Sequence, residues 1–180
     1  MMKSTASGQS TKALVLCALF AAVTAVLSQL SLPLPFTPVP INLATLAVFA
    51  AGGLLGPVYG AVSLVVYVVL GAAGLPVFAQ FSGGIGILIG PTGGYIMGYI
   101  AAAAMTGWIA KRLQRQFWGN VLAMTAGLAV CYAMGTAWFM FSTKTGLWAA
   151  LGMCVLPFLI GDALKILCAA FLVNRLARHV

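Results

Sequence analysis

The sequence predicts an all-α membrane protein with six transmembrane helices, built as a single integral membrane domain over residues 1–180. Hydrophobic residues make up 63% of the chain and charged residues only 6%, whereas a soluble domain needs about a quarter of its residues charged to cover its surface. Several apolar runs approach the roughly 20 residues that a helix needs to cross the hydrocarbon. Lysine and arginine gather in the gaps between these runs. The outer surface of the chain is therefore expected to face lipid.

The charge balance and the residue types exclude several classes of function. The formal net charge of +8 arises from nine Lys and Arg residues against one acidic residue, and in a soluble protein it would suggest a nucleic-acid partner. Here the basic residues are placed to orient the chain in the bilayer, so no nucleic acid is expected. The sequence holds no Cys-x-x-Cys pair, no Ser–His–Asp or Cys–His set, no second acid and no Walker motif. We therefore expect no metal ion, no cofactor and no enzymatic activity.

Six apolar runs are assigned as membrane spans. A tight turn at Gly56 and Pro57 separates the second run from the third, so these two helices are expected to be antiparallel neighbours. The sixth run is long enough to include a kink at Pro157. The approximate bounds of the six spans are residues 13–30, 41–55, 58–74, 91–110, 121–141 and 147–173.

The distribution of basic residues predicts the orientation. With six spans both termini share a side, and that side holds seven Lys and Arg residues, whereas the other side holds only Lys144. Cytoplasmic loops carry the excess of Lys and Arg, so the N-terminal segment 1–12 and the C-terminus are predicted inside a bacterial-type cytoplasmic membrane. The seven residues are Lys3, Lys12, Lys111, Arg112, Arg115, Arg175 and Arg178.

Two irregular apolar segments then share the outer side. Residues 32–40 hold four prolines with Phe36 and Thr37 between them, and such density forbids helix and favours a stiff extended backbone. This segment is predicted to be a lid, with a plain connector as the alternative. Residues 75–90 are broken by glycine and proline. They form either a cavity wall with Gln80 and Ser82 as its polar groups, or a loop resting at the interface.

The fourth span opens at Pro91, and the residues that follow it offer backbone N–H groups at a helix start. Such a start attracts anions. Gly93 and Tyr95 are therefore candidates to bind an anionic group of a ligand through their backbone. Gly94 and Gly98 lie four residues apart, a spacing that favours close helix packing over a phosphate loop.

The only acidic residue, Asp162, lies inside the sixth span with Lys165 three positions later. This spacing puts both on one face of a helix, and ionisable residues in a membrane mark a functional site by default. They form either a structural ion pair or a ligand-binding pair in a cavity open to the outside. The lack of a second carboxylate argues against a proton relay or a cation pathway. It favours a small, partly apolar ligand that is neutral or anionic.

A stripe of small residues in the first span is suited to close helix approach. Ala18 and Ala22 lie four apart, as do Ala21 and Ala25. The stripe packs either within the chain or against another protein. A binding protein without an energy-coupling motif also suggests that a partner supplies the energy.

Four segments together resemble the biotin-specific substrate-binding component, the BioY family, of energy-coupling-factor vitamin transporters. These segments are Leu-Pro-Phe-Thr-Pro-Val-Pro-Ile at 34–41, Gly-Ala-Ala-Gly-Leu-Pro-Val-Phe at 71–78, Gly-Pro-Thr-Gly-Gly-Tyr at 90–95 and Gly-Asp-Ala-Leu-Lys at 161–165. The resemblance extends over nearly the whole chain. It implies six helices, a pocket open to the outer face and high-affinity capture of biotin.

The resemblance also implies partners and residue roles. The chain would assemble with a transmembrane coupling protein and two ATPase subunits, which alone would use ATP. Asp162 and Lys165 would contact the ureido ring of biotin, Gln80 would supply an amide contact to that ring, and the stripe of Ala18 and Ala22 would dock on the coupling protein. The alternatives are a component for another vitamin or a self-sufficient secondary transporter.

Overall fold

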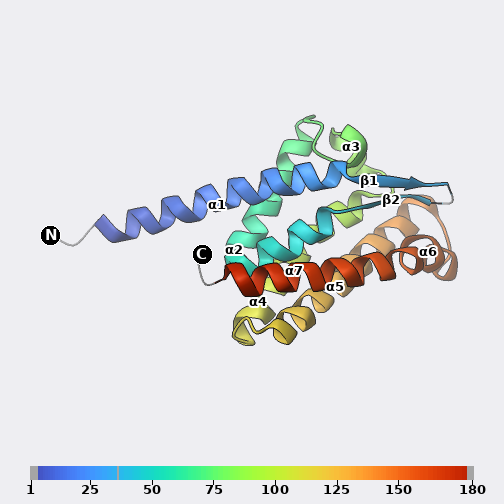
Figure 1. Cartoon of the computed structure of the whole chain (residues 1–180). Helices are drawn as coiled ribbons and strands as arrows, with labels where there is room; N and C mark the ends of the chain where they lie inside the picture. The colour runs from blue at the N-terminus through green and yellow to red at the C-terminus, as the bar shows by residue number, and fades with distance from the viewer. Residues whose placement is uncertain (1–3, 36, 178–180) are drawn as a thin grey trace.

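The computed structural model describes residues 4–35 and 37–177, with side chains from residue 11 onward. Within these residues the chain forms long helices that run along one another, with both ends of the chain at one end of the molecule and the β-hairpin and α6 at the other (Figure 1). The elements are α1 (Ser4–Gln29), β1 (Ser31–Leu34), β2 (Thr37–Asn42), α2 (Ala44–Ala72), the 3₁₀ turn η1 (Ala79–Phe81), α3 (Ile85–Ile89), α4 (Gly93–Arg112), α5 (Phe117–Thr143), α6 (Leu147–Cys154), the 3₁₀ turn η2 (Leu156–Phe158) and α7 (Leu159–Leu176).

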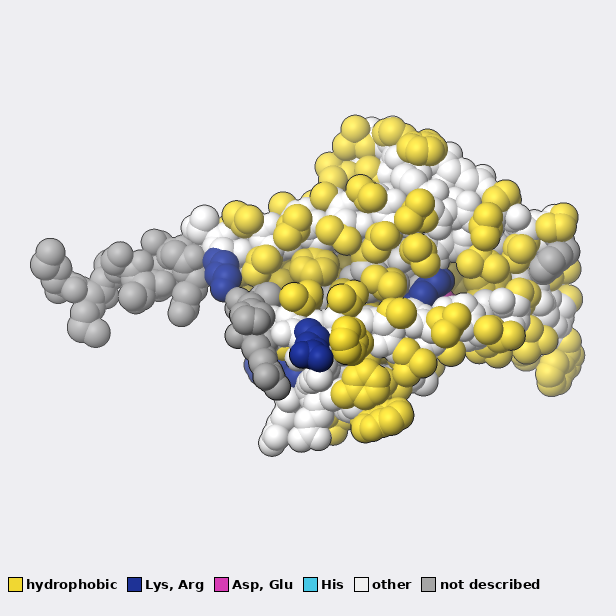
Figure 2. Space-filling view, viewed as in Figure 1, with side chains coloured by type: hydrophobic (Ala, Val, Ile, Leu, Met, Phe, Trp, Pro, Cys, Tyr) yellow, Lys and Arg dark blue, Asp and Glu magenta, His cyan; other side chains and the backbone are white. Residues whose placement is uncertain are grey.

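The helical membrane architecture is confirmed in its coarse form. Four helical stretches are long and apolar enough to cross a membrane, namely 11–29, 44–72, 117–143 and 147–176. The first, fifth and sixth predicted spans correspond to three of them. The second and third predicted spans fall together in α2. The fourth falls on α4, which is not among the four stretches. Apolar side chains cover the lengths of the helices, while most of the Lys and Arg side chains in view lie near the end that holds the termini (Figure 2).

The predicted turn between the second and third spans is a sharp break inside α2. Gly56 adopts φ 81° and ψ −176° and is followed by Pro57, a backbone conformation that glycine reaches without strain. A methyl group added at Gly60 would lie 3.0 Å from Cα of Gly52. The two arms of α2 therefore fold back against each other just beyond the break. Nη2 of Arg115 donates a hydrogen bond of 3.1 Å to the carbonyl of Leu54, which the break leaves without a helical partner.

The proline segment is extended, as predicted, but it also pairs with itself. Strands β1 and β2 form an antiparallel hairpin in which Ser31 faces Asn42 and Leu32 faces Ile41. The prediction of an all-α fold was wrong at this point. Proline can occupy the edge of a ribbon where its missing N–H faces outward, and a two-stranded ribbon has only edges.

Helix α4 lies at the centre, packed against α2 on one side and α5 on the other. Its glycines permit this approach, because a Cβ at Gly107 would lie 2.4 Å from the carbonyl carbon of Gly56 and one at Gly98 would lie 3.3 Å from Cα of Cys131. Glycine and tyrosine contribute little hydropathy, so the glycines and the two tyrosines of α4 lower its mean hydropathy. This accounts for its absence from the four apolar stretches.

The kink predicted at Pro157 is confirmed. Helix α6 ends at Cys154, Val155 leaves helical geometry with φ −125° and ψ −58°, and Pro157 lies in η2 before α7 begins. The break sets the start of α7 beside the hairpin end of the molecule.

We predict that Gly107→Ala destabilises the protein by about 1–3 kcal/mol, because the added methyl group meets backbone atoms that cannot turn away. The matched control is Gly152→Ala in α6, where a Cβ meets no atom within 4 Å. The thermal unfolding midpoint of each purified variant in detergent measures the difference. Equal midpoints for the two variants would contradict the close packing of α4 on the break in α2.

Candidate functional site

A cavity of about 250 Å³ lies between the helices near the hairpin end. Strand β2, both arms of α2, η1, the first turns of α4 and α7, the middle of α5 and η2 all contribute to its wall. Most of the wall is apolar or aromatic, and Asp162 and Lys165 are the only charged side chains that line it among the described residues. The lining residues are Pro38, Val39, Pro40, Asn42, Thr45, Tyr67, Phe78, Ala79, Gln80, Ser82, Ile87, Thr92, Tyr95, Ile96, Tyr99, Cys131, Tyr132, Cys154, Phe158, Asp162 and Lys165.

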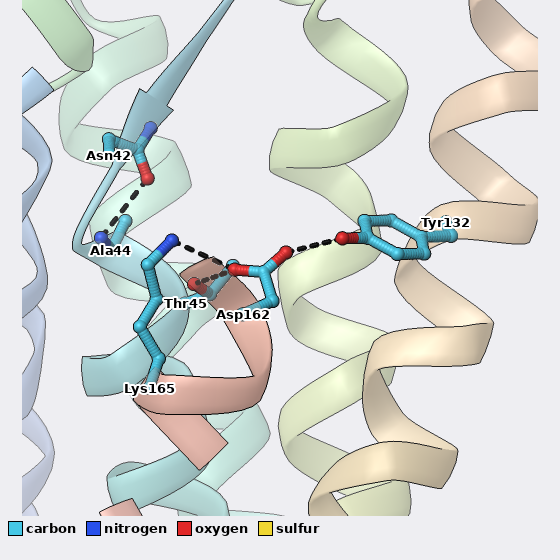
Figure 3. A network of polar contacts seen from close by, with 6 residues as sticks. All are labelled: Asn42, Ala44, Thr45, Tyr132, Asp162 and Lys165. Atoms are coloured by element: carbon cyan, nitrogen blue, oxygen red, sulfur yellow. Dashed lines mark hydrogen bonds and ion pairs between the residues drawn. The ribbon is translucent and has the colours of Figure 1, made fainter. Parts of the chain in front are cut away.

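Asp162 and Lys165 face the cavity from the start of α7 and form an ion pair with each other. Nζ of Lys165 lies 2.8 Å from Oδ1 of Asp162, and the side chains are only 8% and 2% exposed, respectively. Oδ1 also accepts a hydrogen bond of 3.3 Å from Oγ1 of Thr45 on α2, and Oδ2 accepts one from the hydroxyl of Tyr132 on α5 (Figure 3). The pair thus joins three helices and lines the cavity, so it combines features of both sequence-based alternatives.

Lys165 keeps donor capacity toward the cavity. An ammonium carries three N–H groups, and the hydrogen bond to Asp162 is the one contact of Nζ among the described residues. Asn42 lies close by at the end of β2, where its Oδ1 accepts a hydrogen bond of 3.1 Å from the N–H of Ala44 (Figure 3). The side chain of Asn42 therefore satisfies a backbone donor at the start of α2 while it lines the cavity.

The loop after α2 contributes to the cavity wall through Gln80 and its neighbours. Gln80 and Phe81 both have positive φ, 59° and 54°, which is uncommon for residues other than glycine. The end of α1 holds this loop, because Oε1 of Gln29 accepts a hydrogen bond of 2.8 Å from the N–H of Phe81 and Oγ of Ser28 donates one of 2.5 Å to the carbonyl of Val77. Gln80 is thereby presented to the cavity.

Phe78 anchors the same loop from inside. Its side chain is 1% exposed and packs edge-on against Tyr67 with the ring centroids 5.5 Å apart. A Cβ at Gly71 would collide with this ring at 2.1 Å, so the glycine makes the space that the ring occupies. Ser82, on the far side of the turn, lines the cavity together with Gln80.

Only some of the other predicted site residues line the cavity. Tyr95 lines the cavity, and its hydroxyl lies 3.1 Å from Oγ1 of Thr136 and donates to the carbonyl of Cys154 at 3.5 Å. Thr37 is buried but does not line the cavity; its Oγ1 accepts a hydrogen bond of 3.2 Å from the N–H of Val39. Phe36 lies outside the described residues. In the predicted lid, Pro38, Val39 and Pro40 line the cavity instead.

The helix start at residues 91–95 differs from the expectation. Gly93 does not line the cavity, and its N–H donates to the carbonyl of Gly90 at 3.0 Å, while the N–H of Tyr95 donates to the carbonyl of Thr92 at 3.1 Å. These backbone donors are used within the turn. Thr92 is the residue of this start that lines the cavity together with Tyr95.

Several lining residues were missed by sequence reasoning. Asn42 and Thr45 carried a signal, because they are polar residues at the opening of an apolar span. The aromatic and sulfur-containing residues carried none, since a tyrosine or cysteine in an apolar run looks the same whether it faces a cavity, a neighbouring helix or lipid. These residues are Tyr67, Tyr99, Tyr132, Cys131, Cys154 and Phe158.

The small-residue stripe of α1 divides between two faces. Ala18 and Ala22 are exposed, whereas Ala21 is 2% exposed and belongs to the hydrophobic core, with Ala25 packed against that core. The second pair therefore packs within the chain. The first pair is open to another protein or to lipid.

Comparisons with known proteins agree on one family. A family model described as "BioY family" matches residues 1–180. The chain is 36% identical over 165 residues to "Biotin transporter BioY" of Thermotoga maritima, covering 92% of this chain and 95% of that protein. It is 40% identical over 167 residues to "Probable biotin transporter BioY" of Pyrococcus horikoshii, covering 92% and 96%. A solved structure, "the S-component for biotin from an ECF-type ABC transporter", superposes with a TM-score of 0.90 at 30% identity over 100% of this chain and 96% of the other.

We predict that Gln29→Ala loosens the loop that carries Gln80. The variant removes the acceptor of the Phe81 N–H and also a hydrogen bond of 3.3 Å from Gln29 to the carbonyl of Pro76. Loss of the first alone, about 1 kcal/mol, should speed hydrogen exchange at the Phe81 amide about fivefold. Mass spectrometry of the peptide around residue 81 measures this rate. Gln116→Ala at the start of α5 serves as the matched control, and an unchanged rate in Gln29→Ala would show that α1 does not hold the loop.

Proposed function

The chain belongs to the BioY family, and on this basis we propose that it captures biotin with high affinity as the substrate-binding component of an energy-coupling-factor transporter. The observation that carries the proposal is the buried Asp162–Lys165 pair at the wall of a largely apolar cavity. Such a cavity with few polar groups suits a small, partly apolar molecule. The family is one of transporters, which agrees with the prediction that the chain is not an enzyme.

The chemistry of the pair fits the ureido ring of biotin. A cyclic urea has N–H donors beside a carbonyl acceptor. Asp162 offers an acceptor and Lys165 offers donors, with the two groups 2.8 Å apart, so one edge of the ring can meet both. The pair is neutral as a whole, and so is the ring. Gln80, Ser82, Thr37 and Phe36 remain proposed contributors from the two loops, of which Gln80 and Ser82 line the cavity.

The remainder of the wall suits the fused thioether ring and the alkyl tail of biotin. Tyr67, Phe78 and Tyr99 present aromatic surface that is apolar except at the hydroxyl groups. For the carboxylate at the end of the tail, the proposal rests on the side-chain hydroxyl groups of Thr92 and Tyr95, which line the cavity. The backbone N–H groups of Gly93 and Tyr95 are already used within the turn.

We also propose that the chain crosses the membrane six times with both termini in the cytoplasm. The two arms of α2 count as two crossings because of the break at Gly56. The last turn of α4 carries Lys111 and Arg112, and the last turn of α7 carries Arg175. This end, which also holds the termini in Figure 1, should be cytoplasmic by the positive-inside rule. The cavity then opens to the outer face, near the hairpin.

The proposed partners are a transmembrane coupling protein and two ATPase subunits. Ala18 and Ala22 on the exposed face of α1 are suited to close contact with a helix of the coupling protein. ATP would be used only by the ATPase subunits, and biotin would be the one ligand of this chain, with no cofactor.

We predict that Asp162→Asn and Lys165→Ala each weaken biotin binding by about 2–5 kcal/mol, because each leaves a buried charged partner without its ion pair. This corresponds to a loss of roughly thirtyfold or more in Kd. Isothermal titration calorimetry on the purified chain measures the loss. Lys111→Ala, at the other end of the molecule, removes a charge without touching the cavity and should bind biotin as the unaltered chain does. Unchanged affinity in both cavity variants would reduce the pair to a structural role.

We predict that Ala18→Trp preserves biotin binding but prevents assembly with the coupling protein. The large side chain projects from the exposed face of α1, so it should block a neighbouring helix without disturbing the core. Co-purification of the coupling and ATPase subunits with the tagged variant measures assembly. Ala21→Trp is the contrasting variant, since Ala21 is buried and its replacement should lower stability. Normal assembly of Ala18→Trp would rule out this face as the docking surface.

A further inference from the structure

The carboxylate of Asp162 is more fully occupied than a ligand-binding acid needs to be. Oδ1 accepts hydrogen bonds from Lys165 and Thr45, and Oδ2 accepts one from Tyr132. The three donors come from α7, α2 and α5, and all line the same cavity (Figure 3). The ion pair with Lys165 balances the charge of Asp162, but the two hydroxyl groups do not change that balance. Besides satisfying the buried carboxylate, the two hydroxyl groups determine which of its acceptor positions stay open to a ligand.

A count of acceptor positions shows what the hydroxyl groups do. A carboxylate has roughly four lone-pair positions, two on each oxygen. Lys165 and Thr45 fill both positions on Oδ1, and Tyr132 fills one of the two on Oδ2. One position, on Oδ2, is left for a ligand. A guanidinium pairs with a carboxylate through two parallel N–H groups, one to each oxygen, and Oδ1 has no position for it.

We propose that Thr45 and Tyr132 are positioning residues that determine head-group specificity, in that they leave Asp162 one acceptor position and so admit a neutral cyclic urea but exclude a cyclic guanidinium. This rests on the proposed capture of biotin and extends it to residues outside the ion pair. Lys165 adds to the exclusion, because its ammonium repels a cation and finds no carbonyl acceptor on it. The other titratable groups that line the cavity carry no charge at neutral pH; they are Tyr67, Tyr95, Tyr99, Tyr132, Cys131 and Cys154.

The two hydroxyl groups have separable effects. Removing the Thr45 hydroxyl opens a position on Oδ1, so that a guanidinium could pair with both oxygens. Removing the Tyr132 hydroxyl opens a second position on Oδ2 but leaves Oδ1 filled. It frees the carboxylate to turn without permitting the two-point pairing. Thr45 thus governs which head group is admitted, and Tyr132 governs how firmly the carboxylate is held.

The test compares biotin with 2-iminobiotin, its cyclic guanidine analogue, by calorimetry on the purified chain and its variants. Below the pKa of the free 2-iminobiotin, specificity is measured as the Kd of 2-iminobiotin divided by the Kd of biotin. Thr45→Val should lower this ratio by about tenfold or more, the range expected for a hydrogen bond to a charged group. Tyr132→Phe should weaken biotin binding by about tenfold and change the ratio by less than about threefold. Thr45→Ser, which keeps a hydroxyl, should retain the ratio of the unaltered chain.

A control variant and a second measurement separate specificity from general damage. Tyr95→Phe removes a hydroxyl that bonds to Thr136 and Cys154 rather than to Asp162, so the ratio should stay the same whatever happens to either affinity. In the unaltered chain, only the uncharged form of 2-iminobiotin should bind. Its apparent affinity should therefore rise about tenfold per pH unit until the ligand loses its proton.

Two results would overturn the proposal. One is a Kd ratio in Thr45→Val equal to that of the unaltered chain, and the other is an affinity for 2-iminobiotin that does not rise with pH. The second needs no variant, so it can refute the proposal even if Thr45→Val fails to fold. A chain that binds neither ligand would instead refute the proposed capture of biotin.

Discussion

The buried ion pair between Asp162 and Lys165 dictates how the helices around the cavity must be arranged. Taking two charges out of water costs more than their attraction returns unless their remaining hydrogen-bonding groups are satisfied. The chain meets this demand by bringing Thr45 from α2 and Tyr132 from α5 to the carboxylate. These hydrogen bonds therefore fix the positions of α2, α5 and α7 relative to one another. Within this network of described side chains, Lys165 keeps N–H donors beyond its bond to Asp162, and it lines the cavity.

The backbone breaks follow from the same site. Irregular backbone at membrane depth is tolerated only where it is buried in protein or lines a cavity, and here η1, η2 and β2 all contribute residues to the cavity wall. The break before α7 places Asp162 in that helix's first turn. The break at Gly56 lies at the other end, where Arg115 satisfies the carbonyl that it exposes. The irregular segments at the hairpin end thus line the cavity, whereas the break at the other end is supported by a hydrogen bond from Arg115.

Helix α1 links the proposed docking face to the cavity. Its outer face carries Ala18 and Ala22, and its last turn holds the loop of Gln80 through Ser28 and Gln29. The same helix therefore carries the proposed docking surface on its outer face and contacts the cavity loop through its last turn. The loop needs such support, because Gln80 and Phe81 hold a left-handed conformation that side chains other than glycine rarely adopt.

Local hydropathy, backbone chemistry and residue spacing were enough to predict the membrane class, the helical stretches, the breaks at Gly56 and Pro157, and the placing of Asp162 and Lys165 on one helix face. The sequence also singled out Gln80, Ser82 and Tyr95, which line the cavity. The hairpin, the position of Gly93 outside the cavity and the outward face of α1 depend on contacts between distant segments, so they became visible in the folded chain alone. The tertiary structure alone revealed Thr45 and Tyr132 as partners of Asp162, across separations of 117 and 30 residues. In an apolar chain, hydrophobicity no longer distinguishes inside from outside, so which face of a helix meets a cavity is decided by packing alone.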